Sequence, residues 1–296
     1  MPRPRAATFL REATTALAAA GVPSPRVDAE LLLAHVLHTG RSEVRRLAVL
    51  DAPVPDAAAT AFAGLLARRV AREPLQHLTG SAPFRHLELA VGPGVFVPRP
   101  ETETVAQVAI DEASRLVAER HVGPVVVDLC TGSGAIALAV AHEVPDARVH
   151  AVELDAAAHA WAARNTAGSC VHLVRGDART ALHELDGTVD VVVSNPPYVP
   201  PDAVPRDPEV ARHDPAVALY GLGPDGLEVP RGVTAAAARL LRPGGLYVME
   251  HAEVQAAAAR AMVDASGAFT PAATRTDLSA RPRMVVARRT AALVEH

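Results

Sequence analysis

The chain of 296 residues contains no lysine, so arginine supplies every strongly basic side chain. Arginine suits bidentate contacts with carboxylates and phosphates, although the base composition of a genome produces the same bias. The net charge is −4, which excludes a protein that binds polyanions over its whole surface.

The sequence has two cysteines, Cys130 and Cys170. This number excludes a disulfide framework and a cysteine metal cluster. The sequence also lacks the apolar stretch of a secretory signal and any apolar run of transmembrane length. We therefore expect a soluble cytoplasmic protein with no metal site and no membrane partner. Hydrophobic residues make up 49%, as in globular proteins, and the length suits about two domains.

Residues 1–80 carry helical patterns over 6–20, 24–40, 42–50 and 56–73. Ser24 is a candidate N-cap, with Pro25 at the first helical position. Short helices with short connections indicate a small bundle, which we expect to be a substrate-docking domain. Its basic character comes from six arginines: Arg41, Arg45, Arg46, Arg68, Arg69 and Arg72. They form either a solvated face or a docking surface for an anionic partner.

Residues 81–98 are expected to form a β-hairpin linker that turns at Gly92-Pro93-Gly94. From 99 to 296 strands and helices alternate, which predicts an α/β fold of Rossmann-like type with a mostly parallel sheet. The expected strands are 125–129, 148–153, 171–175, 189–194 and 245–250. The expected helices are 102–120, 135–143, 156–165, 226–241 and 253–266. Segments 269–275 and 284–287 are expected to add an antiparallel edge.

A glycine-rich loop follows the strand at 125–129. Its glycines let the backbone approach a ligand closely, and free N–H groups at the following helix start face the same space. The expected cofactor-binding residues here are Asp128, Cys130, Thr131, Gly132, Ser133 and Gly134. Glu153 ends the next strand, where a carboxylate can bind both hydroxyls of a ribose. The pattern also fits a dinucleotide site, so alone it does not separate NAD from S-adenosylmethionine (SAM).

The residues Asn195-Pro196-Pro197-Tyr198 follow the strand at 189–194. Proline fixes its own φ and restricts the residue before it, so the Asn195 side chain and the Pro196 carbonyl become two rigid acceptors. Two such acceptors suit a planar –NH2 group, as on glutamine, asparagine or adenine. Tyr198 adds an aromatic face. We expect all four residues to bind substrate, and Asn195, Pro196 and Tyr198 to be catalytic.

Asp177 and Ala178 follow the third strand, where an adenine amino group needs an acceptor. Asp128 is placed to meet a cationic amino group. Polar residues at four successive strand ends converge on one crevice in such sheets. A methyl donor beside an amine acceptor explains Asn-Pro-Pro-Tyr, whereas a dinucleotide does not. We therefore expect SAM as cofactor, with Asp177, Ala178 and Asn195 among its contacts.

Over nearly its whole length the chain resembles the protein-(glutamine-N5) methyltransferases that modify peptide chain release factors. The resemblance rests on residues 73–80, 96–103, 128–138, 195–198 and 213–219. It implies a SAM-dependent methyltransferase fold and methylation of the glutamine in a Gly-Gly-Gln loop, with release factors as partners. The chain departs from the family at Cys130, where glycine is frequent, and at Ala178, where some members carry a bulky aromatic.

Three alternatives remain. An adenine-N6 DNA methyltransferase shares Asn-Pro-Pro-Tyr but needs a target-recognition region and a basic cleft. The net charge and the small helical domain disfavour it, so we expect no direct nucleic-acid contact. A non-catalytic SAM-binding protein of translation and a dehydrogenase are the others. No general base is assigned, because a proton can leave the product cation after transfer.

Several other residues could have structural roles. Arg99 and Glu101 form either an ion pair between the domains or a wall of the pocket. Glu250 and His251 end a strand near the crevice, where structural hydrogen bonding is favoured over catalysis. Trp161, among helical alanines, is expected in the core.

Overall fold

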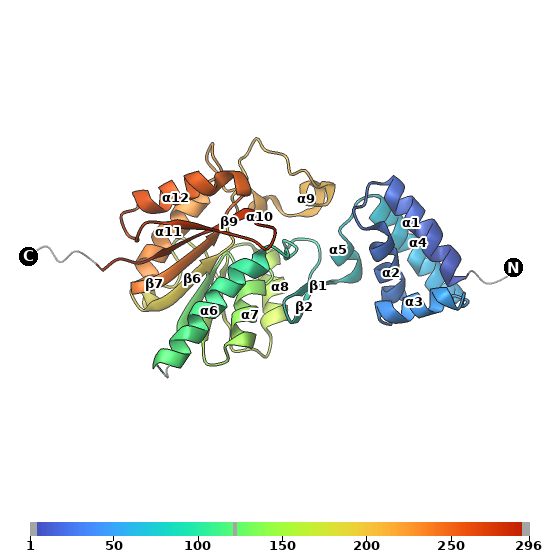
Figure 1. Cartoon of the computed structure of the whole chain (residues 1–296), viewed down its shortest axis with the longest axis horizontal. Coiled ribbons are helices and arrows are strands. Elements are labelled where there is room, and N and C mark those ends of the chain that lie inside the picture. Colours follow the sequence, from blue (N-terminus) through green and yellow to red (C-terminus); the bar gives the residue numbers. More distant parts are fainter. Residues whose placement is uncertain (1–4, 121–122, 292–296) are drawn as a thin grey trace, which may run out of the picture. The chain divides into compact units, whose positions relative to one another are not determined.

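The computed structural model describes residues 5–120 and 123–291. It consists of two compact units (Figure 1). The first unit ends at Ser81 and also contains Pro205–His213, and the second contains Ala82–Val204 and the chain from Asp214 onward. The first unit thus includes a segment that lies far along the sequence, in the connection that follows Asn-Pro-Pro-Tyr.

The first unit is a small helical bundle. Ser24 stands at the N-cap of the second helix and Pro25 at its first position, but the Ser24 side chain makes no cap hydrogen bond. Leu10, Leu17 and Phe62 are among the fully buried side chains of its core. The helices are α1 (Ala6–Ala19), α2 (Pro25–Val36), α3 (Arg41–Val49), α4 (Asp56–Val70), α5 (Leu75–Thr79) and α9 (Pro208–His213).

Several arginines of this unit pair with acids. Arg69 is buried and donates to Asp28 at 2.8 Å and to Glu209 at 2.7 Å. Arg72 donates to both oxygens of Glu209, at 2.7 and 2.6 Å. Burial alone would raise the pKa of Glu209, but the hydrogen bonds from Arg72 and Arg69 lower it to about 2. These two cations hold Pro205–His213 within the unit, so neither belongs to a solvated or anion-docking face. Further pairs are Arg41–Glu30, Arg46–Glu43 and Arg68–Glu73.

The second unit is built on a seven-stranded sheet with the order β5-β4-β3-β6-β7-β9-β8. The first five strands in this order run parallel, and β9 pairs antiparallel with β7 and β8. The α/β prediction with an antiparallel edge is therefore confirmed. The strands are β3 (Val125–Leu129), β4 (Arg148–Glu153), β5 (His172–Arg175), β6 (Val189–Ser194), β7 (Leu241–Glu250), β8 (Ala273–Thr276) and β9 (Pro282–Arg288).

Helices cover both faces of this sheet (Figure 1). Because side chains alternate along a strand, Val126 packs in the cluster that contains α6 and α7, whereas Val127 and Leu129 pack in the cluster that contains α11 and α12. The helices are α6 (Thr102–Arg120), α7 (Ala135–Glu143), α8 (Ala156–Thr166), α10 (Ala216–Leu219), α11 (Glu228–Leu240) and α12 (Ala256–Ala265), with short 3-10 turns His183–Leu185 and Glu253–Gln255. Within the described residues, no helix combines the length and the apolar character needed to cross a membrane.

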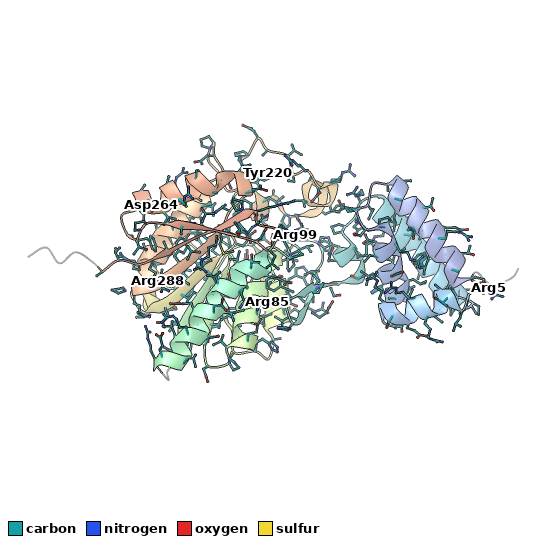
Figure 2. All side chains as sticks on the ribbon, in the orientation of Figure 1. Arg5, Arg85, Arg99, Tyr220, Asp264 and Arg288 are labelled. Carbon is teal, nitrogen blue, oxygen red and sulfur yellow. The ribbon has the colours of Figure 1, made fainter. Side chains whose placement is uncertain are left out.

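The predicted position of the hairpin turn is wrong. The two strands of the small sheet are β1 (Ser81–Phe84) and β2 (Leu87–Ala90), so the connection is Arg85-His86. Arg85 adopts a left-handed φ of 55° and is held there by long-range contacts (Figure 2). Its backbone N–H donates to Glu103 at 2.9 Å, and its guanidinium donates to Glu143 at 2.7 Å.

The Gly92-Pro93-Gly94 stretch has a packing role instead. A Cβ at Gly92 would lie 2.6 Å from the ring of Trp161, so only glycine permits this approach. The indole N–H of Trp161 donates to the Pro93 carbonyl at 3.2 Å. Trp161 is only partly buried against the core. Its ring and its indole N–H fix the position of this loop.

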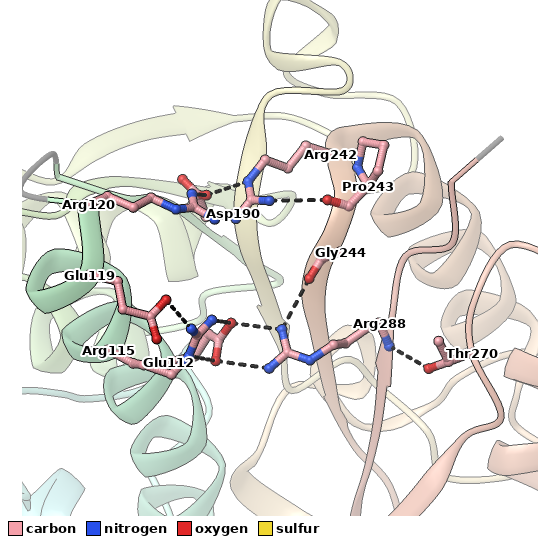
Figure 3. Close-up of polar contacts among 10 residues, drawn as sticks. All are labelled: Glu112, Arg115, Glu119, Arg120, Asp190, Arg242, Pro243, Gly244, Thr270 and Arg288. Atoms are coloured by element: carbon pink, nitrogen blue, oxygen red, sulfur yellow. Dashed lines mark hydrogen bonds and ion pairs between the residues drawn. The ribbon is translucent and has the colours of Figure 1, made fainter.

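Two arginine–carboxylate clusters join α6 to the sheet (Figure 3). Glu112 accepts hydrogen bonds from Arg115 and from Arg288 of β9. Asp190 of β6 accepts from Arg120 and Arg242 at 2.8 and 2.6 Å. Asp190 lies at the amino end of β6, so its cluster joins α6 to the end of the sheet opposite the carboxyl ends of the parallel strands.

Candidate active site

Polar residues gather at the carboxyl edge of the parallel strands. Leu129 of β3 lies opposite Val152 of β4 and Ser194 of β6 in the sheet register, so these strands end side by side. The chain continues from β3 to β4 on one side, while β6 lies on the other side. Open α/β sheets bind ligands at such a switch point. Asp128, Glu153 and Asn195 all occur at this edge.

Asp128 is completely buried behind the glycine-rich loop. Its Oδ2 accepts from the Thr131 hydroxyl at 2.5 Å and from the Ala137 N–H at 3.1 Å. Within the described part of the chain, its Oδ1 has no hydrogen-bond partner. Burial raises the pKa of Asp128 to about 7, reinforced by the charge of Glu153 and opposed by the two hydrogen bonds. A cationic ligand group at Oδ1 would relieve this arrangement.

The loop after β3 needs left-handed backbone at three residues. Gly132 and Gly134 have φ of 59° and 86°, and Cys130 has φ of 63°. A side chain at such a φ costs about 1–2 kcal/mol, so Cys130 holds a backbone conformation that glycine would adopt more readily. Burial, and then the charges of Glu153 and Asp128, raise the pKa of the Cys130 thiol. The thiol is thus neutral at ordinary pH and is no nucleophile.

Glu153 lies at the end of β4 and connects this strand to the glycine-rich loop after β3. Its Oε2 accepts from the Gly132 N–H and its Oε1 from the Asp155 N–H, both at 2.8 Å. Burial raises the pKa of Glu153, opposed by these backbone donors. Each carboxylate oxygen can accept a second hydrogen bond. The carboxylate is therefore fixed in place with capacity left for a diol.

Asp177 follows β5, and its carboxylate already has a partner. Arg179 donates to it from Nε at 2.9 Å and from a terminal nitrogen at 2.6 Å. The hydrogen bonds from Arg179 lower the pKa of Asp177, and the side chain of Ala178 is buried. Contacts of Asp177 and Ala178 with an adenine stay a prediction.

The Asn-Pro-Pro-Tyr segment leaves β6 with its backbone fixed by neighbours. The Tyr198 N–H donates to the Leu219 carbonyl at 3.1 Å, and the Gln255 amide donates to the Tyr198 carbonyl at 2.8 Å. The Asn195 amide nitrogen donates to the Thr102 hydroxyl at 3.3 Å. Within residues 5–120 and 123–291, the Asn195 Oδ1 and the Pro196 carbonyl accept no hydrogen bond. Neither acceptor is therefore occupied by another described residue, and their contact with a ligand stays a prediction.

Two residues of this region were missed by the sequence reasoning, Thr102 and Gln255. Thr102 is buried at the start of α6, and its hydroxyl lies between Asn195 and Glu250. Its position directly after Pro100-Glu101 offered a signal, but its partner lies 93 positions away in the sequence.

Arg99 pairs with Asp214 at 2.6 Å and lies 4.9 Å from the Phe96 ring centroid. It is labelled in Figure 2. The prediction left open an ion pair with Glu101, and the structure places Arg99 on Asp214 instead.

These residues fit S-adenosylmethionine. The buried Asp128 Oδ1, which has no partner among the described residues, suits its ammonium group, and the fixed Glu153 carboxylate suits its ribose hydroxyls. The free acceptors of Asn195 and Pro196 suit a planar amine beside it. The geometry therefore combines a cationic cofactor site with an –NH2 site.

Comparisons with known proteins agree with this reading. The family described as PrmC N-terminal domain matches residues 8–80, and the Methyltransferase small domain matches residues 101–208. The chain is 52% identical over 280 residues to the release factor glutamine methyltransferase of Streptomyces coelicolor, covering 94% of this chain and 96% of that protein. It is 50% identical over 289 residues to the one of Mycolicibacterium smegmatis, covering 97% and 99%.

A third relative carries a different name. The chain is 41% identical over 274 residues to the 4-amino-L-phenylalanine/4-methylamino-L-phenylalanine methyltransferase of Streptomyces pristinaespiralis, covering 92% of this chain and 91% of that protein.

Proposed function

This chain belongs to the release factor glutamine methyltransferase family, and we infer that it transfers a methyl group from SAM to a glutamine side chain of a peptide chain release factor. We propose the side-chain nitrogen of the glutamine in a Gly-Gly-Gln loop as the acceptor. The observation that carries this proposal is the pair of acceptors at Asn195 and Pro196, which receive no hydrogen bond from the described residues and match the two hydrogens of a primary amide.

The mechanism follows from what these residues do to the amide. When bound, SAM supplies an electrophilic methyl group. Asp128 and Glu153 would hold the cofactor at the strand ends, while Asn195 and Pro196 would each accept a hydrogen bond from one N–H of the amide. An amide nitrogen is a poor nucleophile because its lone pair is delocalised. As this nitrogen gains positive charge its hydrogens become more acidic, so the two acceptors bind the transition state more strongly than the ground state.

The relative from Streptomyces pristinaespiralis supports a second candidate. Its name specifies the aromatic amine of a free amino acid, which is also a planar –NH2 group. The Asn195 and Pro196 acceptors therefore fit either an amide or an arylamine. An adenine amine fits the same chemistry, but Arg69 and Arg72 are bound to Glu209 and Asp28, which removes two cations from any phosphate-binding surface.

Mass spectrometry separates these candidates. The full chain and SAM are incubated in three separate reactions. One contains a purified release factor, one contains 4-amino-L-phenylalanine, and one contains adenine-containing DNA. A single added methyl on the Gly-Gly-Gln glutamine supports the proposal, with a release factor carrying Gly-Gly-Ala as the matched control. Methylation of 4-amino-L-phenylalanine with an unmodified release factor would replace the proposal by the second candidate.

We propose that the first unit docks the release factor, because it carries no cofactor motif and yet holds Pro205–His213 through Glu209. Deleting residues 1–80 should raise KM for the intact release factor and leave SAM affinity near normal. The deletion also removes the partners of Pro205–His213. A Glu209→Gln variant, which weakens the contacts of this segment with Arg69 and Arg72 but keeps residues 1–80, is therefore the control. Equal KM values for the deletion and the full chain would refute docking.

A further inference from the structure

A chain of hydrogen bonds connects Asn195 and Tyr198, the two side chains of Asn-Pro-Pro-Tyr that we predict to be catalytic, to one buried carboxylate. The Thr102 hydroxyl donates to Glu250 Oε2 at 2.8 Å, and the Asn195 amide nitrogen donates to Thr102 at 3.3 Å. The Tyr198 hydroxyl donates to Glu250 Oε1 at 3.2 Å. Glu250 is 1% exposed and Thr102 is 4% exposed, so water does not compete at either residue.

The direction of this chain determines which end of the Asn195 amide faces the substrate. A hydroxyl has one hydrogen, and an ionised Glu250 can only accept, so the Thr102 hydrogen points to Glu250. The Thr102 oxygen must then accept from Asn195, which turns the amide nitrogen toward Thr102 and leaves Oδ1 for the ligand. The opposite amide orientation would set N–H donors against the N–H donors of the substrate.

We propose that Glu250 is the positioning residue of this site. Through Thr102 it selects the amide orientation of Asn195 that accepts a hydrogen from the substrate nitrogen, and directly it fixes the ring of Tyr198. The proposal rests on the proposed function, because only an –NH2 substrate needs an acceptor at that point. Ionised Glu250 also polarises the chain of hydrogen bonds, which makes Asn195 Oδ1 a stronger acceptor.

The charged groups around Glu250 come from each neighbouring element. Arg283 of β9 lowers its pKa and Glu101, just before α6, raises it. Tyr198 and Thr102 lower it by hydrogen bonding, but burial is the largest effect and raises the pKa of Glu250 to about 7. Burial lowers the pKa of the adjacent His251, so that residue stays neutral. Protonated Glu250 would carry an O–H donor beside its remaining acceptor capacity, so the Thr102 hydrogen would no longer have to point toward it and the Asn195 amide would lose its fixed orientation.

Variants at Thr102 test the chain without altering the buried charge. Thr102→Val removes the hydroxyl at equal size, and Thr102→Ser keeps it. We expect kcat for release factor methylation to fall about 10²-fold in the valine variant, as for a misplaced reacting group, while KM and SAM affinity stay unchanged. Serine should restore most of the rate. Thr234→Val is the matched control. Thr234, like Thr102, is buried and its hydroxyl makes a buried side-chain hydrogen bond, in this case with the Tyr247 hydroxyl at 3.0 Å.

A pH profile tests Glu250 itself. The ionised carboxylate is the active form, so the single-turnover rate of the wild type should fall as pH drops through about 7. The rate is measured at saturating SAM because Asp128 titrates in the same range. Glu250→Gln should be slow and lack this acid limb. The double variant with Thr102→Val should be no slower than the slower single variant, because both act through one chain.

The outcomes are distinct. A Thr102→Val variant with normal kcat, or one matched in its loss by Thr234→Val or by Thr102→Ser, would overturn the positioning role. So would an acid limb that persists in Glu250→Gln. If the wild-type chain leaves the release factor unmodified in the same assay, the proposed function fails first, and this inference fails with it.

Discussion

Replacing Asp128 by asparagine should have opposite effects on stability and on cofactor binding. The substitution keeps the shape of the side chain and one acceptor for Thr131 and Ala137. It removes the charge that burial disfavours. It also removes the partner that we assign to the ammonium group of SAM, where a charge-assisted hydrogen bond contributes about 1.5–3 kcal/mol. We therefore expect SAM affinity to fall about 10- to 100-fold.

The stability effect follows from the pKa. A rise from 3.8 to about 7 corresponds to about 4 kcal/mol against the ionised form once the pH exceeds both values. The folded protein binds the extra proton, so stability is lost as pH rises from 3.8 to about 7. The new amide nitrogen would occupy the position of Oδ1, which has no partner among the described residues, at a cost of about 1–3 kcal/mol. The net gain of Asp128→Asn is therefore about 1–3 kcal/mol above pH 7.

Urea unfolding of the cofactor-free protein measures this gain. The difference between variant and wild type should be larger by about 2 kcal/mol at about pH 8 than at about pH 5.5, because the wild-type cost is incomplete at the lower pH. Calorimetry gives the SAM affinity of the same samples. A variant that is less stable than the wild type at about pH 8, or that binds SAM normally, would refute the assignment of Asp128.

Three further changes test other parts of the account. Glu153→Ala should weaken SAM binding at least tenfold, about 1.4 kcal/mol or more, and calorimetry showing unchanged affinity would refute the ribose assignment. Gly226→Ala should lower kcat, because Gly226 has a left-handed φ and a Cβ there would lie 2.5 Å from the Tyr198 carbonyl oxygen. Normal kinetics would show that the packing of Gly226 does not support the Asn-Pro-Pro-Tyr segment. Glu112→Gln should lower unfolding free energy by about 1–3 kcal/mol at neutral pH, a difference that disappears as pH falls from 4.5 to about 2. Hydrogen bonds from Arg288 and Arg115 hold that pKa down against burial, so a pH-independent difference would contradict this.

The sheet and its edge could be predicted because they depend on local sequence. Valine-rich runs bounded by polar residues placed β3 and β6 at the residues that the structure gives them. Once parallel strands are known, their carboxyl ends share one edge, so Asp128, Glu153 and Asn195 could be placed there without coordinates.

Tertiary partners could not be predicted. The hairpin turns at Arg85 and not at Gly92-Pro93-Gly94, because Glu103 and Glu143 bind Arg85. Both acids lie far from Arg85 in the sequence. Arg69 looked like a surface residue, but Asp28 and Glu209 bury it from two distant segments. Side-chain pairing of this kind leaves no periodic signal in the sequence.

The central claim is that Asn195 accepts a hydrogen from the substrate nitrogen as charge develops there. Its most direct test is single-turnover methyl transfer to a Gly-Gly-Gln release factor by Asn195→Ala, paired with SAM titration. Loss of one preorganised partner lowers such rates about 10²- to 10³-fold, so we expect kcat to fall by that factor while SAM still binds through Asp128 and Glu153. Near-normal transfer by Asn195→Ala would show that Asn-Pro-Pro-Tyr is only a turn here and would contradict the account.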